Sequence, residues 1–200
     1  MYKVYGDYRS GNCYKVKLML HLLGMDYQWE AIDILKGETR SEAFLEKNPN
    51  GKIPVLELED GSYLWESNAI LNFLADGSTY LPAEPRLRTQ VLQWQFFEQY
   101  SHEPNVAVAR FIKLYQGMPE ERRGEYETCL ELGYRALKVM DKQLQNTSFL
   151  VGESFSIADV ALYAYTHVAD EGGFDLVAFP AIRAWMDRVS AQPGYVGMFD

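Results

Sequence analysis

The stretch that decides the fold spans residues 48–70 and reads NPNGKIPVLELEDGSYLWESNAI. Within it, an apolar run at 53–58 is followed by an Asp60-Gly61 pair and then by the aromatic segment 63–65. Asp-Gly between two such runs favours a tight turn, so we expect two antiparallel strands joined as a hairpin. The residues after the second strand predict a helix over about 67–75.

The sequence upstream of this stretch alternates strand and helix signals. A short strand is expected at 2–5 and another at about 27–34. Between them, apolar residues recur at helical spacing and end at Gly24, a typical C-cap; these residues are Val16, Met19, Leu20 and Leu23. The first part of the chain therefore mixes strands with helices.

From about residue 86 onward the sequence predicts helix after helix. The segment 77–85 carries Gly, Ser, Thr and two prolines, which is the composition of a connection between domains. We therefore predict two domains, a mixed α/β domain at 1–79 and an all-helical domain at 86–200.

The helical part contains its own start and stop signals. Pro104 removes a backbone donor and should kink or break the helix that begins near residue 85. Further helices are expected from Pro119 and from Pro180, because proline suits the first turn. The sequence Ser156-Ile157-Ala158-Asp159 has the spacing of a capping box, which would start another helix.

The overall composition excludes several classes of protein. With 48% hydrophobic and 24% charged residues, the chain has the composition of an ordinary globular protein and not of a disordered one. Its formal net charge of -9 disfavours nucleic acid and anionic membranes as partners. Charges interrupt every apolar stretch before it could span a bilayer, and no signal peptide is recognisable.

The cysteines and histidines give no sign of a metal site or a disulfide. Cys13 and Cys129 lack CxxC spacing, which favours a reducing, cytoplasmic location. The three histidines have no metal-ligand spacing, so no metal is expected; they are His21, His102 and His167.

The motifs NPNGKIPVL at 48–56 and ESNAI at 66–70 resemble signatures of the cytosolic glutathione transferase family, in the family's spacing. The resemblance implies a thioredoxin-like α/β domain at the N-terminus and an all-α domain at the C-terminus. It also implies that glutathione is the co-substrate, that the chain forms a homodimer and that no metal takes part.

The resemblance further assigns the residues that bind glutathione. It implies a cis Pro54, with the backbone N–H and C=O of Ile53 pairing with the cysteinyl unit in the manner of an added strand. Ser67, at a helix start, would receive the γ-glutamyl carboxylate, and Glu66 the amino group. Lys52 is a further expected contact for a carboxylate.

The segment between the first strand and the first helix is where the family places the group that faces the thiol. Ser10 resembles the catalytic serine of the theta- and delta-type classes, and a hydroxyl that donates to sulfur at a helix N-terminus would stabilise a thiolate. Asn12 replaces the family's usual proline. Ser-x-Asn also resembles the Thr-x-Asn of bacterial members that reduce glutathione disulfide, so Asn12 is a second candidate for the sulfur.

Other residues are weaker candidates for the site. Arg40 is a candidate for the glycyl carboxylate of glutathione. Cys13 lies in the loop that some bacterial classes use, but its helical spacing to Val16 favours a core position. The family builds a pocket for the second, apolar substrate from the first helices of the C-terminal domain, so Tyr100, Phe111 and Tyr115 are candidates for that pocket. Tyr8, in the loop before the first helix, is a further candidate for the same pocket and for the sulfur contact.

Three functions remain open at this point. The first is a transferase that activates the glutathione thiol with Ser10 for attack on apolar electrophiles. The second is a reductase that uses two glutathiones to reduce disulfides or peroxides. The third is a ligand-binding protein without catalysis, because a fold alone does not determine function.

Overall fold

The N-terminal unit is built on a mixed four-stranded sheet. The computed structural model describes residues 1–200 and divides into two units. The first unit consists of Met1–Ser78 together with Gln192–Asp200, and the second consists of Thr79–Ala191. The strands of the first unit are β1 (Tyr2–Gly6), β2 (Tyr27–Ala31), β3 (Val55–Glu57) and β4 (Tyr63–Trp65), in the order β2-β1-β3-β4. β1 and β2 are parallel, whereas β3 is antiparallel to both β1 and β4.

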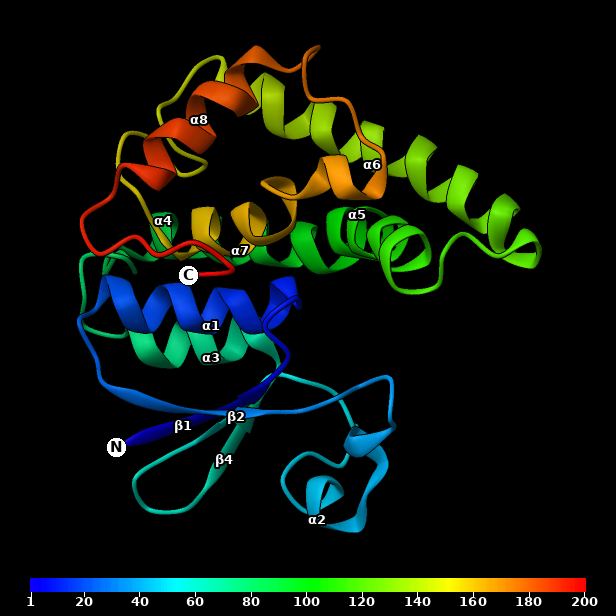
Figure 1. Cartoon of the computed structure of the whole chain (residues 1–200). Helices are drawn as coiled ribbons and strands as arrows, with labels where there is room; N and C mark the ends of the chain where they lie inside the picture. The colour runs from blue at the N-terminus through cyan, green and yellow to red at the C-terminus, as the bar shows by residue number, and fades with distance from the viewer. The chain divides into compact units, whose positions relative to one another are not determined.

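Helices cover one face of this sheet. α1 (Gly11–Leu22) and α3 (Ser67–Ala75) lie side by side on that face, and the short α2 (Glu42–Leu45) lies away from it, after the single turn η1 (Glu38–Arg40) (Figure 1). Parallel β1 and β2 need a crossover, which α1 supplies. This β-α-β-α-β-β-α order is the thioredoxin-like arrangement that the sequence predicts.

The predicted hairpin is present, with a shorter first strand. Gly61 has a φ of 82° in the turn, a conformation that glycine adopts without a steric penalty. β3 begins only at Val55, because Pro54 has no N–H to donate to the ladder. β2 likewise ends at Ala31, since the Asp33 carboxylate then accepts the N–H groups of Leu35 and Lys36 and turns the chain.

The C-terminal segment belongs to this first unit. After the last helix, residues 192–200 lie along α1 (Figure 1). The Tyr14 hydroxyl donates to the Val196 carbonyl at 2.8 Å, and the buried Lys17 ammonium donates to the carbonyls of Gly197 at 3.2 Å and Asp200 at 2.7 Å. Nothing in the local sequence announces this return, because it depends on partners about 180 residues upstream.

The second unit is entirely helical. Its longer elements are α4 (Pro85–Phe97), α5 (Glu103–Arg110), α6 (Arg123–Leu144), α7 (Ile157–Thr166) and α8 (Pro180–Ser190). Shorter turns separate them: η2 (Glu98–His102), η3 (Phe111–Tyr115), η4 (Glu120–Arg122) and η5 (Ala169–Gly172). The predicted fold class, a thioredoxin-like domain followed by an all-α domain, is confirmed.

The expected break at Pro104 takes the form of a wider helical turn. η2 and η3, on either side of α5, are π-helical, and Pro104 is the second residue of α5, directly after η2. Proline has no N–H to donate to a preceding carbonyl, so the regular α-helical hydrogen-bond pattern is interrupted here. The chain therefore passes from α4 to α5 without a loop. The prediction of a disrupted helix is correct. The disruption lies in η2, the turn immediately before the proline.

α7 forms the core of the helical unit. All ten of its residues are buried, as expected of a helix that is surrounded on every side. The predicted capping box is present: the Ser156 hydroxyl accepts the Ala158 N–H, and the Asp159 carboxylate accepts the Ser156 N–H at 2.9 Å. Asp159 also accepts the indole N–H of the buried Trp185 at 2.9 Å, which joins α7 to α8.

Candidate functional site

Ser10 lies at the N-terminus of α1, as predicted. It has extended backbone angles and is the N-cap, and its hydroxyl oxygen accepts the Cys13 N–H at 3.4 Å. That contact occupies a lone pair of the oxygen and leaves the hydroxyl proton for another acceptor. Ser10 is half-buried, so it is held by the helix and still reachable from solvent.

Ser67 is the first residue of α3 and not its cap. The N-cap position is taken by Glu66, whose φ of 68° is in the left-handed region that non-glycine residues rarely adopt. Such a conformation is typical of residues held at functional sites. Because the first helical hydrogen bond runs from the Ile70 N–H to the Glu66 carbonyl, the preceding N–H groups of this helix start point outward as donors for an anion.

Asn12 connects the starts of the two helices. Its side-chain oxygen accepts the Ser67 hydroxyl at 3.1 Å and the Lys15 ammonium at 2.8 Å, and Lys15 also donates to the Ser67 oxygen at 3.3 Å. Lys15 is fully buried and Ser67 is 5% exposed. The three side chains are therefore hydrogen-bonded to one another at the N-termini of α1 and α3.

The loop before β3 is shaped by its asparagines. Asn48 is buried, and its amide donates to the Lys52 carbonyl at 2.7 Å while its oxygen accepts the Asn50 N–H at 2.9 Å. The Asn50 amide in turn donates to the Glu66 carboxylate at 3.4 Å. The NPNG part of the motif thus builds a rigid turn that reaches Glu66.

The end of this loop presents the backbone that the sequence predicts. The Ile53-Pro54 peptide bond is cis, as expected. The Ile53 backbone lies outside the strand ladder, and no hydrogen bond within the chain engages it. Lys52 is exposed.

Arg40 lies against the same loop. Its guanidinium reaches the Asn50 carbonyl at 3.5 Å and occupies the space beside Gly51, where an added Cβ would come within 2.6 Å of an Arg40 nitrogen. Gly51 also has a positive φ of 62°. The structure therefore groups Arg40 with the motif loop of residues 48–54.

Cys13 is a core residue. It is fully buried, and burial raises the pKa of its thiol to about 12. Its sulfur packs so closely on β1 that a Cβ added at Gly6 would lie 2.8 Å away. Hence this cysteine is a neutral thiol at pH 7, in agreement with the core position expected from helical spacing.

Tyr8 is half exposed and stacks on Trp29 of β2, with ring centroids 4.7 Å apart. The Trp29 indole N–H is buried without a hydrogen-bond partner. Tyr8 thus forms a flat aromatic surface in the loop that also carries Ser10.

The other candidates for the second-substrate pocket lie in the helical unit. Tyr100 is 88% exposed and lines a groove of about 290 Å³ beside α6, which it shares with Phe97 and Val139. Phe111 and Tyr115 are half-buried and stack on each other in η3 with centroids 5.1 Å apart. Neither Phe111 nor Tyr115 lines the groove of Tyr100.

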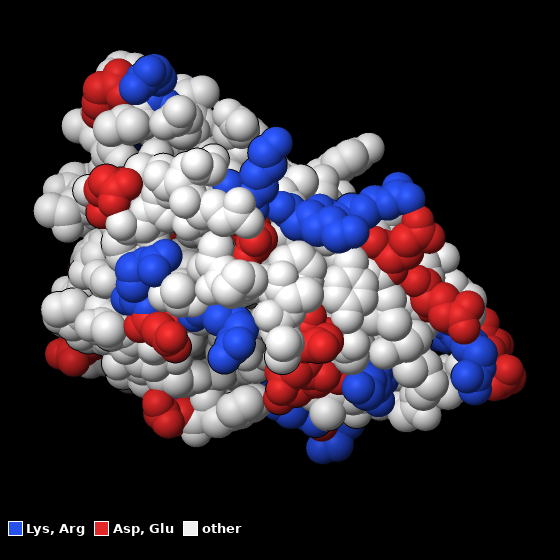
Figure 2. Space-filling model, turned by 90° about the horizontal axis from the view of Figure 1, so that it is seen from above, with Lys and Arg blue, Asp and Glu red and all other residues white.

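The charged residues outside the site show no large basic surface on the face drawn in Figure 2, where Lys and Arg lie among Asp and Glu. No cluster of three or more His, Cys, Asp or Glu residues is arranged to hold a metal. None of the helices combines the length and apolar character needed to cross a membrane.

Sequence reasoning missed Lys15 and Asn50. Lys15 follows Asn12 by three residues, so the two side chains share a face of α1, but a lysine on a helix usually faces solvent. Asn50 stands at the variable position of the NPxG motif. The spacing from Asn12 to Lys15 was a usable signal, whereas the contact of Asn50 with Glu66 joins residues 16 positions apart.

Comparisons with known proteins agree with this arrangement. Residues 9–76 match the family model of the glutathione S-transferase N-terminal domain, and residues 99–193 match that of the C-terminal domain. The disulfide-bond oxidoreductase YfcG of Escherichia coli K12 is 30% identical over 201 residues, which cover 91% of this chain and 87% of the relative.

Solved structures extend the agreement to the whole chain. A crystal structure of glutathione S-transferase from Pseudomonas fluorescens Pf-5 matches with a TM-score of 0.98 and 74% identity, covering 100% of this chain and 99% of the other. The glutathione transferase URE2P6 of Phanerochaete chrysosporium, solved in complex with oxidized glutathione, matches with a TM-score of 0.87 and 26% identity, covering 96% and 92% of the two chains.

Proposed function

Because this chain belongs to the glutathione transferase family, we propose that it binds glutathione at the N-termini of α1 and α3 and activates the thiol with Ser10. The observation that carries the proposal is the meeting of these two helix starts through Asn12 and Ser67, whose side chains lie 3.1 Å apart. A helix N-terminus stabilises an anion. The N-terminus of α1 would stabilise the thiolate, and the N-terminus of α3 would bind the γ-glutamyl carboxylate.

The remaining contacts follow the shape of glutathione. The Ile53 backbone N–H and C=O would pair with the cysteinyl unit, and Glu66 would accept its γ-glutamyl ammonium group. Lys52 and Arg40 are the proposed partners of the glycyl carboxylate, since Lys52 precedes Ile53 in the loop and the Arg40 side chain lies against the same loop. The strained φ of Glu66 supports this role, because strain is tolerated where function requires it.

In the proposed reaction, the Ser10 hydroxyl donates to the glutathione sulfur and lowers the thiol pKa from near 8.5 toward neutrality. The thiolate then attacks an electrophilic carbon, a carbon–sulfur bond forms, and the leaving group departs with its electron pair. The aromatic residues proposed for the second substrate are Tyr8, Tyr100, Phe111 and Tyr115.

A second candidate function is disulfide reduction, and it is favoured by Asn12 together with the identity to a disulfide-bond oxidoreductase. Here the thiolate of one glutathione attacks a disulfide, releases one thiol and leaves a mixed disulfide. A second glutathione attacks the mixed disulfide, which yields glutathione disulfide and the second thiol. Asn12 would donate its amide to the sulfur in this reaction.

Two measurements test the proposal. Saturating glutathione should raise the melting temperature, because a ligand that binds only the folded state stabilises it. An unchanged melting temperature would remove the claim of binding. Turnover with an aryl halide and with a small disulfide then separates the two reactions, and an unshifted thiol pKa of bound glutathione would favour a ligand-binding protein without catalysis.

The physiological setting belongs to the same proposal. We place the protein in the cytoplasm, as a homodimer, with a small apolar electrophile as its second substrate and a role in detoxification typical of the family. Both cysteines are free and buried, which suits a reducing compartment.

A further inference from the structure

Trp29 is an aromatic residue of the N-terminal unit that neither proposed reaction uses. It lies in β2, an edge strand of the sheet, and its partner in the register is the fully buried Val4 of β1. Residues paired in register point to the same face of a sheet. A Cβ added at Gly6 would lie 2.8 Å from the Cys13 sulfur of α1 and 3.2 Å from the Trp29 indole. Gly6 therefore leaves the space in which the Trp29 ring packs, on the face of the sheet that α1 covers.

The Trp29 ring supports Tyr8. The two rings stack with centroids 4.7 Å apart and with an angle of 19° between their planes. The Tyr8 side chain makes no hydrogen bond within the chain and no other ring contact, so this stack is its one directional interaction. Tyr8 remains 50% exposed, because Trp29 covers only one face of its ring.

A tight turn places the Tyr8 ring beside the proposed thiol site. The Ser10 N–H donates to the Asp7 carbonyl at 3.0 Å, which closes a β-turn with Tyr8 as its second residue. The Asp7 carboxylate accepts the Arg9 N–H at 2.8 Å and so stabilises the turn from within. One residue of this turn separates Tyr8 from Ser10, so the ring lies close to the N-terminus of α1, where the sulfur of glutathione is proposed to bind.

The indole N–H indicates which part of Trp29 matters. Its nitrogen is buried and has no hydrogen-bond partner. A buried donor without an acceptor costs free energy, and a buried tryptophan N–H usually finds a partner. Phenylalanine at this position would carry no such cost, so the contribution of tryptophan is its extended ring surface. Tyr8 stacks on that surface.

We propose that Trp29 is a positioning residue for the second substrate: it holds the Tyr8 ring as a flat surface on which a planar group of that substrate stacks. This proposal rests on the proposed function, in which Tyr8 belongs to the second-substrate pocket. A mobile ring would lose conformational freedom when the substrate binds, whereas a ring that Trp29 already holds has lost it on folding. Trp29 should therefore favour planar aromatic substrates over flexible aliphatic ones.

The matched test compares Trp29→Leu with Trp94→Leu. Trp94 also pairs with an aromatic ring, Phe97 at a centroid distance of 5.3 Å, but it lies in α4 of the helical unit. With the planar substrate chlorodinitrobenzene, Trp29→Leu should raise KM about three- to tenfold at nearly constant kcat, which is the range expected for one aromatic pair. KM for hexyl iodide and glutathione affinity by calorimetry should stay at the wild-type values. Trp94→Leu should leave all of these quantities unchanged.

Two further variants separate the ring from other effects. Trp29→Phe keeps a ring beneath Tyr8 and removes the indole N–H, so it should restore most of the wild-type KM. In the Tyr8→Leu background, Trp29→Leu should raise KM no further, because the ring through which it acts is absent. An equal KM rise in both backgrounds, or a Trp29→Phe variant as impaired as Trp29→Leu, would overturn the proposal.

The remaining outcomes also decide. If Trp29→Leu does not fold, Tyr8→Leu takes its place: a KM rise confined to the planar substrate supports the proposal, and unchanged selectivity overturns it. If the substrates are disulfides, diphenyl disulfide and hydroxyethyl disulfide form the planar and aliphatic pair. If the wild type turns over these substrates and Trp29→Leu keeps its selectivity, this proposal alone fails. If the wild type turns over none of them, the proposed function itself fails.

Discussion

Lys15 and Lys17 stand two positions apart in α1 and are both buried, yet they serve different parts of the molecule. Residues two positions apart in an α-helix are separated by about 200° around its axis, so their side chains leave on nearly opposite sides. Lys15 donates to Asn12 and Ser67, whereas Lys17 donates to backbone oxygens of Gly197, Met198 and Asp200. At this scale, the role of a residue follows from the side of the helix on which it lies.

Ser10 and Ser67 should differ in the kind of defect that their loss produces. Ser10→Ala removes the proposed donor to the sulfur, so the bound thiol pKa should rise and turnover should fall while glutathione affinity stays nearly constant. Ser67→Ala removes the proposed charge-assisted bond to the γ-glutamyl carboxylate, which should cost about 1.5–3 kcal/mol and weaken binding about ten- to hundredfold. Calorimetry and steady-state kinetics on both variants measure this contrast. Full activity in Ser10→Ala with loss in Asn12→Ala would transfer the catalytic role to Asn12.

Cys13 should be dispensable for the chemistry. Its burial and its thiol pKa of about 12 predict that a disulfide reagent reacts slowly with native protein and rapidly after denaturation. Cys13→Ala should retain turnover and lose about 1 kcal/mol of stability for the deleted sulfur. Cys129→Ala, at the other buried cysteine, is the control. Loss of turnover in Cys13→Ala alone, with the fold intact, would point to a cysteine-type mechanism.

Among the elements, α7 depends on one buried carboxylate. Asp159 accepts the backbone N–H groups of Leu150 and Ser156 and the indole N–H of Trp185, all at 2.9 Å. Burial raises its pKa to about 6, although these hydrogen bonds favour the ionised form. One side chain thus joins the start of α7 to α8 and to the preceding loop.

The pH dependence of stability should reveal this carboxylate. Between about pH 4 and pH 6 the folded state keeps a proton that the unfolded state has lost, so the contribution of Asp159 to stability falls as pH rises through this window. The free energy of unfolding of wild type minus that of Asp159→Asn should drop by about 3 kcal/mol across it. Urea denaturation of both proteins from pH 4 to pH 7 measures the difference.

Asp60→Asn provides a control with the opposite sign. The Ser62 hydroxyl and N–H donate to Asp60 in the hairpin turn and hold the pKa of that carboxyl below its usual value. Its contribution is therefore lost as pH falls, not as pH rises. If the free energy of unfolding of wild type minus that of Asp159→Asn stays constant or increases as pH rises, the raised pKa of Asp159 is contradicted.

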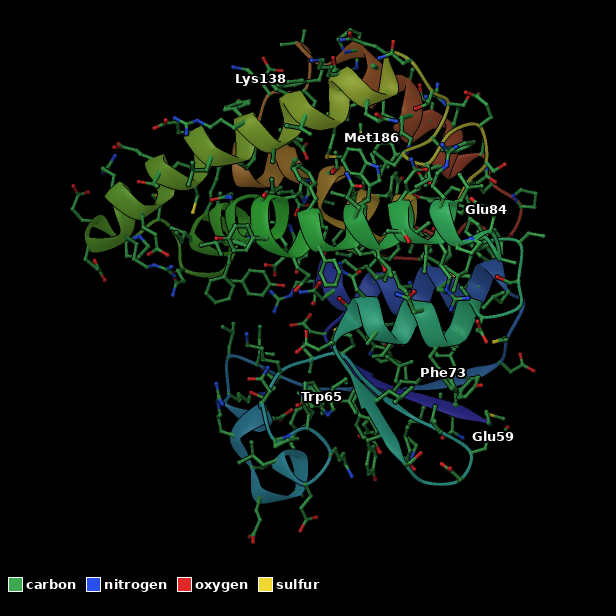
Figure 3. The ribbon with its side chains drawn as sticks, turned by 180° about the vertical axis from the view of Figure 1, so that it is seen from behind. Glu59, Trp65, Phe73, Glu84, Lys138 and Met186 are labelled. Atoms are coloured by element: carbon green, nitrogen blue, oxygen red, sulfur yellow. The ribbon has the colours of Figure 1, made fainter.

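At the scale of the whole molecule, each unit exposes large apolar side chains that a second copy would cover. In the N-terminal unit these are Trp65 at the end of β4, 40% exposed, and Phe73 on α3, 45% exposed (Figure 3). In the helical unit Phe96 is 70% exposed and Tyr100 is 88% exposed. Exposed apolar surface of this kind is typical of association sites, and it supports the proposed homodimer.

The homodimer should therefore be sensitive to charge on these surfaces. Sedimentation at micromolar concentration is expected to show a dimer for the wild type and a monomer for Phe73→Glu or Phe96→Glu, since burying an unpaired carboxylate at an interface is costly. Val177→Glu, at an equally exposed apolar residue in the loop before α8, should leave the dimer intact. A monomeric wild type would contradict the proposal.

The sequence by itself determined the elements, because their signals are local. The Asp60-Gly61 turn, the capping box at Ser156, the helix starts at Pro85 and Pro180 and the motif around Pro54 each specify the backbone within a few residues. The two-domain fold class followed from these signals and from the family resemblance. Ser10, Asn12 and Ser67 could be named because the family resemblance assigns roles to residues near the predicted helix starts.

Only the tertiary structure decided how these residues meet. The contact of Asn12 with Ser67 spans 55 positions, the burial of Lys15 depends on both, and the C-terminal segment reaches Lys17 across about 180 positions. The left-handed φ of Glu66 has no glycine to announce it. Local patterns cannot specify such pairs, because a hydrogen bond between distant residues depends on how the helices pack against the sheet and not on the spacing of either partner along the chain.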